Sequence, residues 1–247
     1  MELEETSILV VEDEPVVREI ISAWLARTGS RVLSAANGAE ALEVLAANHA
    51  NLVVSDVQMP VMDGITLLKR LPEVVKHRPA FLFITGYSTL APREAYDLGA
   101  DALLEKPIAR DHLLTAVKRS LTQRDVLWQT PVDFAPQVVL RAAFDNLAAT
   151  LREQRLAFGR GGFCMESSQT LTEGPVRFVI EFTEDQRHLQ GYGIVRWVSP
   201  LEGQVGIELL HVDDENRPWV VELAQRSGLM AFIPRTVNTD HADGSNI

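Results

Sequence analysis

The chain has few features of a secreted or membrane protein. Its 247 residues include a single cysteine, Cys164, which cannot form an internal disulfide, so nothing points to an oxidising compartment. No apolar run is long enough to span a membrane, and the start Met-Glu-Leu-Glu-Glu lacks the basic and apolar regions of a signal peptide. We therefore expect a cytoplasmic protein that does not associate with a membrane.

A shortage of positive charge narrows the range of partners. The formal net charge is −11, whereas an extended nucleic-acid-binding surface needs a stripe of basic residues. Residues 125–247 also lack a helix-turn-helix pattern, so a DNA-binding regulator is disfavoured. What the chain does contain is 46% hydrophobic residues, which at this length suffices for one large domain or two ordinary domains.

Residues 7–123 alternate between short apolar runs and helical periodicity. Five runs are typical of buried strands: Ser7–Val11, Arg31–Ala35, Leu52–Ser55, Ala80–Ile84 and Ala102–Glu105. Helical patterns follow them at about Pro15–Thr28, Ala39–Ala47, Ile65–Val75, Ala91–Leu98 and Asp111–Leu121. This alternation predicts a first domain, residues 1–124, of the α/β class: a doubly wound, five-stranded parallel sheet covered by helices on both faces.

Polar residues stand at the ends of four of these strand patterns. They are Glu12 and Asp13 after the first, Asp56 after the third, Thr85 after the fourth and Lys106 after the fifth. Any one acidic residue could simply cap the following helix. Because the carboxyl ends of parallel strands share one edge of a sheet, where sites are built, five such residues together favour a functional site.

Three carboxylates at one edge would repel one another unless a cation lies between them. Mg²⁺ typically takes carboxylates, a carbonyl and waters, and the backbone carbonyl of Gln58, two residues past Asp56, is a candidate ligand beside Glu12, Asp13 and Asp56. Asp56 could then attack a phosphoryl donor and form an acyl phosphate. Lys106 would neutralise charge on the transferred group, and the Thr85 hydroxyl could bind one of its oxygens.

These residues resemble the receiver domain of bacterial two-component response regulators. The resemblance covers residues 5–123 and rests on the motifs Glu12-Asp13, Asp56, Met59-Pro60-Val61-Met62-Asp63-Gly64, Thr85-Gly86 and Lys106-Pro107. It implies a flavodoxin-like fold, bound Mg²⁺, and phosphorylation of Asp56 by a phosphohistidine on a sensor histidine kinase or phosphotransfer protein. It also implies no enzyme activity beyond the domain's own phosphorylation and dephosphorylation, and output through the face around the fourth and fifth helices.

One position departs from the family pattern. Receiver domains often have an aromatic switch residue three positions before the lysine, and this chain has Leu103 there. The coupling between Thr85 and the output face is therefore expected to differ from that of an aromatic switch.

Residues 125–156 are predicted to form a linker followed by a connector helix over about Gln137–Gln154. The apolar residues of this stretch are spaced 4, 3 and 4, as in a coiled-coil seam: Leu140, Phe144, Leu147 and Leu151. The seam spans under two heptads, so alone it would be marginal. Packing on its own domain and a homodimer or inter-domain contact remain equal alternatives.

From Gly159 the apolar period changes to two, which predicts a small antiparallel sheet or barrel with helices at its ends, spanning residues 157–230. Val176–Phe182, Gly193–Val198 and Val205–Leu210 are the predicted strands, and a final helix is expected over about Asp214–Ser227. Residues 231–247 are expected to be a flexible tail.

This region resembles the β-barrel module called PilZ. The resemblance covers about residues 157–226 and rests on Arg160-Gly161-Gly162-Phe163, Val195-Arg196-Trp197-Val198 and Val205-Gly206-Ile207-Glu208-Leu209-Leu210. PilZ modules usually bind cyclic di-GMP through an R-x-x-x-R pair and an Asp/Asn-x-Ser-x-x-Gly motif. Here Ala157 and Gly159 replace the acid or amide and the serine, and Arg152 and Arg155 are three apart rather than four.

Two hypotheses for the second domain follow. In the first, it has lost nucleotide binding and acts on a protein partner under the control of Asp56. In the second, it binds cyclic di-GMP through Arg152, Arg155 and Arg160, whose guanidinium groups suit phosphates. The missing amide and hydroxyl favour the first hypothesis.

Overall fold

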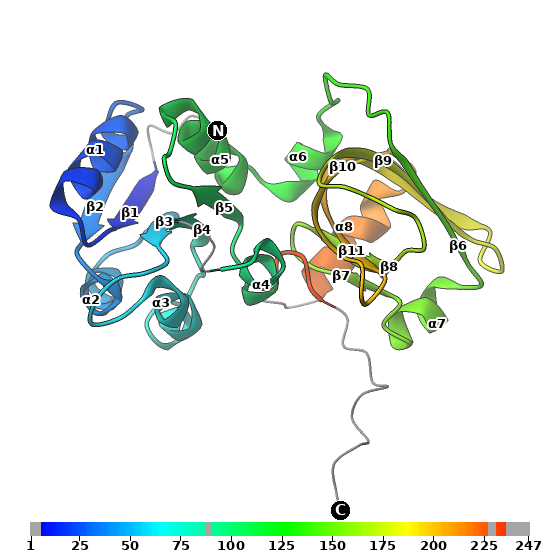
Figure 1. Ribbon diagram of the computed structural model, residues 1–247, viewed down its shortest axis with the longest axis horizontal. Coiled ribbons are helices and arrows are strands. Elements are labelled where there is room, and N and C mark those ends of the chain that lie inside the picture. The colour runs from blue at the N-terminus through cyan, green and yellow to red at the C-terminus, as the bar shows by residue number, and fades with distance from the viewer. Residues whose placement is uncertain (1–5, 87–89, 227–230, 236–247) are drawn as a thin grey trace, which may run out of the picture. The chain divides into compact units, whose positions relative to one another are not determined.

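A computed structural model describes residues 6–86, 90–226 and 231–235. The chain divides into two compact units, Met1–Gln123 and Arg124–Ile247 (Figure 1). Among the described residues, no helix is both long enough and apolar enough to cross a membrane.

The described part of the first unit is a five-stranded parallel sheet in the order β2-β1-β3-β4-β5 with helices on both faces (Figure 1). Its strands are β1 (Ser7–Val11), β2 (Arg31–Ala35), β3 (Leu52–Asp56), β4 (Ala80–Thr85) and β5 (Ala102–Glu105). Its helices are α1 (Pro15–Ala26), α2 (Gly38–Ala47), α3 (Gly64–Arg70), a 3₁₀ turn η2 (Leu71–Glu73), α4 (Pro92–Leu98) and α5 (Arg110–Leu121). The predicted α/β sheet is confirmed.

The central strands are apolar on both faces because both faces are covered. Successive strand side chains point to opposite sides of a sheet. Leu9 and Val53 pack into a core with α2, α3 and α4, whereas Val10 and Val54 pack into a second core with α1 and α5. All five residues of β3 are buried, which places its last residue, Asp56, at the edge of a rigid element.

The described part of the second unit is built on a six-stranded sheet in the order β6-β9-β10-β11-β8-β7. The strands are β6 (Val139–Phe144), β7 (Leu156–Phe158), β8 (Gly162–Glu166), β9 (Gly174–Phe182), β10 (Arg187–Ser199) and β11 (Gln204–Val212). The helices are α6 (Arg124–Gln129), α7 (Leu147–Arg152) and α8 (Arg217–Arg226). All neighbouring pairs are antiparallel except β6 and β9, which are parallel.

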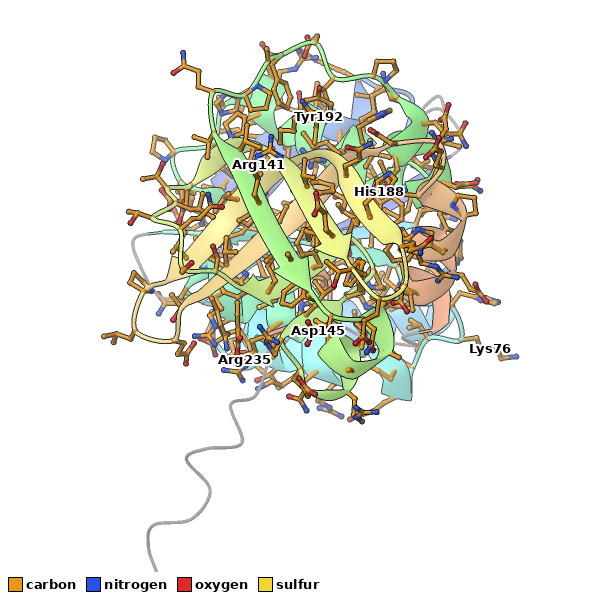
Figure 2. The ribbon with its side chains drawn as sticks, turned by 90° about the vertical axis from the view of Figure 1, so that its right-hand side faces the viewer. Lys76, Arg141, Asp145, His188, Tyr192 and Arg235 are labelled. Carbon is orange, nitrogen blue, oxygen red and sulfur yellow. The ribbon has the colours of Figure 1, made fainter. Side chains whose placement is uncertain are left out.

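The two faces of this sheet differ as the period of two predicts. Val176, Phe178, Ile180 and Phe182 of β9 are fully buried in the core. The opposite face carries polar side chains, and Figure 2 shows Arg141 on β6 with His188 and Tyr192 on β10. Register places Arg141 and Val179 side by side and Tyr192 opposite Arg177, so this face runs continuously across three strands.

The predicted connector helix over Gln137–Gln154 is wrong. Its first part is strand β6, in which Leu140 and Phe144 are buried in the core of the second unit. Only the short α7 is helical, and its Leu147 and Leu151 pack partly buried against the same core. A spacing of four fits alternate positions of a strand as well as a helical turn, so the spacing could not distinguish them. The proposed oligomer seam is therefore part of an internal core.

Two other boundaries differ from the prediction. Residues 124–129 form α6 instead of a linker, and its Trp128 is fully buried and donates from Nε1 to the Leu209 carbonyl at 3.2 Å. Phe232 and Ile233, assigned to a flexible tail, are fully buried. The end of the predicted final helix at Ser227 and the tail residues 236–247 lie outside the described residues.

Candidate functional site

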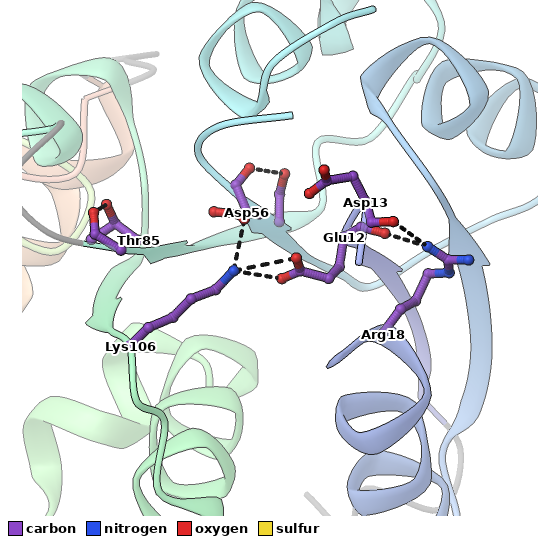
Figure 3. A network of polar contacts seen from close by, with 8 residues as sticks. Glu12, Asp13, Arg18, Asp56, Thr85 and Lys106 are labelled. Atoms are coloured by element: carbon purple, nitrogen blue, oxygen red, sulfur yellow. Dashed lines mark hydrogen bonds and ion pairs between the residues drawn. The ribbon is translucent and has the colours of Figure 1, made fainter. Parts of the chain in front are cut away.

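The polar residues that were predicted from the sequence to form a site lie together at the C-terminal edge of the parallel sheet. Glu12 and Asp13 follow β1, Asp56 ends β3, Thr85 ends β4 and Lys106 follows β5. Pairing of β3 with β1 and β4 aligns these ends, since Val11 is opposite Ser55 and Asp56 is opposite Ile84. Figure 3 shows Lys106 directed at Asp56 and Glu12, with Thr85 on the other side of the lysine from Glu12.

Lys106 is held between two carboxylates. Its Nζ donates to Asp56 Oδ2 at 2.8 Å and lies 3.0 Å from Glu12 Oε2 and 3.2 Å from Glu12 Oε1. The side chain of Glu12 is 1% exposed and that of Asp56 is 9% exposed, whereas that of Lys106 is 24% exposed. The ion pairs are thus largely shielded from water. Opposite charges attract more strongly in such a buried environment than at the protein surface.

The protonation equilibria reflect this shielding. Burial raises the pKa of Glu12 above its usual value and the charge of Asp56 adds to the rise, while the hydrogen bond from Lys106 opposes it. Burial alone would lower the pKa of Lys106, but the hydrogen bonds to Asp56 and Glu12 outweigh it, so its pKa is raised. The lysine therefore stays charged, and burial disfavours the charged form of the Glu12 carboxylate.

Asp56 is positioned by close backbone packing as well as by its strand. Ser55 Oγ donates to the Asp56 carbonyl at 2.8 Å. Gly64, at the start of α3, approaches so closely that a Cβ on it would lie 2.2 Å from the same carbonyl oxygen. A side chain at position 64 would push α3 away from Asp56. This steric conflict explains why a glycine follows Asp63.

The remaining predicted residues lie around this centre. The buried Thr85 places its hydroxyl at the sheet edge and donates to the Gly86 carbonyl at 3.0 Å. Gln58 lies in the loop between β3 and α3, two residues past Asp56. Leu103 lies on β5, is partly buried and packs against the core that contains α4.

The carboxylates fit a hard divalent cation. Ligand oxygens of Glu12, Asp13 and Asp56 all lie within 4.8 Å of one another. Three carboxylates and one ammonium group leave an excess of two negative charges at this edge. All-oxygen ligands of this kind are those that Mg²⁺ prefers.

One polar contact of this site was not predicted from the sequence. Arg18 on α1 donates from Nη1 to the main-chain carbonyl of Glu12 at 2.5 Å and to that of Asp13 at 3.4 Å (Figure 3). A signal was available, because cations are disfavoured near the positive N-terminal end of a helix and Arg18 is the fourth residue of α1.

The three arginines proposed for nucleotide binding have different surroundings. Arg152 is exposed in the last turn of α7. Arg155 lies 3.3 Å from Glu166 and stacks on the Phe144 ring at 5.0 Å, beside a groove of about 590 Å³ between β6 and the end of β8. Arg160 lies over the Phe232 ring at 5.8 Å. The arginine contacts therefore do not define a common ligand site.

The turn from Gly159 to Gly162 is covered by residues 231–234. Arg160 donates its backbone N–H to Ala231 and Gly161 donates to Phe232, at 3.1 and 2.9 Å. A Cβ on Gly161 would lie 2.1 Å from the Phe232 ring, and a Cβ on Gly159 would lie 2.5 Å from the Phe232 carbonyl oxygen. Residues 231–234 thus pack directly against this turn.

Fold and site together define an α/β domain with a cluster of carboxylates and a lysine at the C-terminal edge of its sheet. Residues 8–118 match the family model of the response regulator receiver domain, and this part of the chain is a receiver domain. The match ends before the second unit begins.

Individual relatives agree over the same region. Response regulator Rre1 of Synechocystis sp. is 36% identical over 124 residues, covering 49% of this chain and 54% of that protein. Sensor histidine kinase RcsC of Escherichia coli is 33% identical over 115 residues, covering 47% of this chain and 12% of that protein. A crystal structure of a response regulator receiver domain protein from Clostridium thermocellum has 27% identity and a TM-score of 0.45, covering 50% of this chain and 99% of that one. The chain thus spans about half of Rre1 and much less of RcsC.

Proposed function

We propose that the chain is a two-component response regulator that accepts a phosphoryl group on Asp56 from a sensor histidine kinase or phosphotransfer protein. The observation that carries the proposal is the contact of the Lys106 ammonium with both the Asp56 and the Glu12 carboxylates at the edge of a receiver sheet. The kinase partner follows from the receiver family, whose members take phosphoryl groups from such kinases.

In the proposed reaction, an Asp56 carboxylate oxygen forms a bond to phosphorus while the phosphorus–nitrogen bond of a phosphohistidine breaks. The electron pair leaves with the imidazole, which is protonated. Lys106, already hydrogen-bonded to Asp56, neutralises charge on the transferred group. The Thr85 hydroxyl leaves the Gly86 carbonyl and donates to a phosphoryl oxygen. The chain modifies only itself, so no further enzyme activity is assigned.

Mg²⁺ is the cofactor that the donor set suits. Glu12, Asp13, Asp56 and the backbone carbonyl of Gln58 would hold it, and the bound ion would neutralise charge on the phosphoryl oxygens. Glu12 and Asp56 are the carboxylates already shielded from water, and Asp13 is the more accessible one.

The second unit is proposed to be a PilZ-like output module that acts on a protein partner and does not bind cyclic di-GMP. Its sheet and the Gly159–Gly162 turn support the PilZ likeness. The cover of that turn by Phe232, together with Ala157 and Gly159 at the positions of the missing polar groups, supports the loss of nucleotide binding.

Phosphorylation of the full chain by a small-molecule phosphodonor with Mg²⁺ tests the first proposal. Wild-type protein and Asp111→Asn, which changes an acidic side chain that is 90% exposed on α5, should both form an aspartyl phosphate. Asp56→Asn should form none. Persistent aspartyl phosphate in Asp56→Asn would contradict the assignment of the acceptor.

A calorimetric titration of cyclic di-GMP into the full chain tests the output proposal. We expect no saturable heat and no change in melting temperature. Saturable binding at micromolar concentration, lost in Arg155→Ala or Arg160→Ala, would instead support the alternative of a regulator that integrates two signals.

A further inference from the structure

The turn that carries Glu12 and Asp13 is fixed from one side by the sheet and from the other by Arg18. The Glu12 N–H donates to the Ala35 carbonyl at the end of β2 at 3.2 Å. On the other side, Arg18 Nη1 donates to the Glu12 and Asp13 carbonyls at 2.5 and 3.4 Å (Figure 3). One guanidinium group therefore sets the direction of two consecutive peptide planes.

The start of α1 has no side-chain cap that could orient the turn in place of Arg18. Glu14 is the N-cap residue and makes no side-chain hydrogen bond to the helix, and Pro15 follows it. Arg18 also donates its backbone N–H to the Glu14 carbonyl at 3.0 Å, so its side chain reaches back from a formed helical turn. The hydrogen bonds of Arg18 thus connect the rigid helix to the acidic turn.

We infer that Arg18 is a positioning residue, which holds the Glu12 and Asp13 carboxylates in the geometry that binds the divalent cation. The inference rests on the proposed Mg²⁺-dependent function of this site. A metal site needs its ligands within roughly 0.5 Å of their productive positions, and groups that orient the ligands typically contribute 10–100-fold to metal affinity. Arg18 is half-buried, so its hydrogen bonds are partly shielded from competition by water.

A purely electrostatic role for Arg18 predicts the opposite result. A guanidinium group close to the carboxylates would repel Mg²⁺, so its removal would tighten binding of the ion. Positioning predicts weaker binding on removal. The sign of the change in Mg²⁺ affinity therefore separates the two roles.

The test is a calorimetric Mg²⁺ titration of the full chain as wild type, Arg18→Met, Arg18→Lys and Arg27→Met. Arg27 is exposed at the other end of α1, so Arg27→Met removes the same charge away from the turn. We expect Arg18→Met to bind Mg²⁺ about 10-fold more weakly or worse. Arg18→Lys should recover part of the affinity, because one donor can still reach a carbonyl, and Arg27→Met should bind as the wild type does.

A second readout separates positioning from general damage to the fold. With a small-molecule phosphodonor, the Mg²⁺ concentration for half-maximal phosphorylation should rise in Arg18→Met, while the rate at saturating Mg²⁺ should return to the wild-type value. Equal or tighter Mg²⁺ binding by Arg18→Met would overturn the inference. If Arg18→Met does not fold, Arg18→Lys decides: weaker binding supports positioning and wild-type affinity overturns it. Absence of Mg²⁺ binding by the wild type would instead refute the proposed function.

Discussion

Replacing Lys106 with methionine removes one positive charge and keeps an unbranched side chain of similar length. In the wild type, Nζ lies 2.8 Å from Asp56 and 3.0 Å from Glu12, whose side chain is 1% exposed. The variant leaves these two carboxylates facing each other with no ammonium between them. We expect the receiver domain to lose stability and to become more dependent on an added divalent cation.

The magnitude follows from the burial of the pair. Removing one partner of a buried ion pair costs about 3–5 kcal/mol, and the 24% exposure of Lys106 places this case near the lower end. A loss of about 3 kcal/mol would lower the melting temperature by roughly 10 °C in a domain of this size.

The loss should depend on pH, because the pKa of Glu12 is already raised by burial and rises further without Lys106. Between the pKa of Glu12 in the unfolded chain and its higher value in the folded state, the folded state binds more protons, so stability falls as pH rises. This pH range is wider in Lys106→Met, because the folded-state pKa of Glu12 is higher without the lysine. The difference in stability between wild type and variant should therefore be smaller at pH 5 than at pH 8.

Thermal unfolding at both pH values, with and without Mg²⁺, measures these effects. Lys118→Met is the matched control, since Lys118 is exposed near the end of α5. Mg²⁺ should raise the melting temperature of Lys106→Met more than that of wild type, because the ion replaces the lost charge. The reasoning is refuted if Lys106→Met is as stable as wild type at pH 8 without Mg²⁺, or if its loss is the same at both pH values.

Three further substitutions test other parts of the structure. Gly64→Ala should destabilise the receiver domain by about 1–3 kcal/mol and slow phosphorylation of Asp56, because the new Cβ would overlap the Asp56 carbonyl oxygen. Denaturant unfolding measures the first effect and a phosphorylation time course measures the second. Val61→Asn should stabilise it by about 0.5–1 kcal/mol in denaturant unfolding, since Val61 has φ 68 and asparagine tolerates that region better. Glu208→Ala should destabilise the second unit by about 3 kcal/mol in thermal unfolding, because it leaves Arg196 without the buried carboxylate at 2.6 Å; an unchanged melting temperature would contradict this.

The receiver half could be predicted from the sequence because its signals are local. The three central strands are short apolar runs that are buried on both faces. A helical pattern follows each of the five strands, so parallel topology places the strand ends together. Asp56 and Lys106 are 50 residues apart in the sequence and 2.8 Å apart in the structure, and the topology alone explains their meeting. The role of Arg18 was not predicted because its partners are backbone carbonyls, which the sequence does not identify; its unfavourable position in the first turn of α1 was the one available signal.

The second half was harder because its decisive contacts join segments that are distant in sequence. Leu140 and Phe144 satisfy both helical and strand spacing, and only pairing of β6 with β9, more than 30 residues later, selects the strand. Similarly, the burial of Phe232 depends on the turn at Gly161, which lacks the Cβ that would block the ring. The local periodicity of the sequence indicates neither of these contacts. Residues 231–235 were therefore predicted to be part of a flexible tail.

The two halves of the chain are joined by a much shorter connection than the predicted connector helix. The predicted connector helix would have separated the receiver domain from the second unit by a separate spacer. Instead, only Thr122 and Gln123 lie between the end of α5 and the start of α6. Trp128 of α6 is fully buried in the second core and donates to the Leu209 carbonyl of β11. A movement of the end of α5 would therefore be transmitted, through two residues, to a helix that is anchored in the core of the second unit.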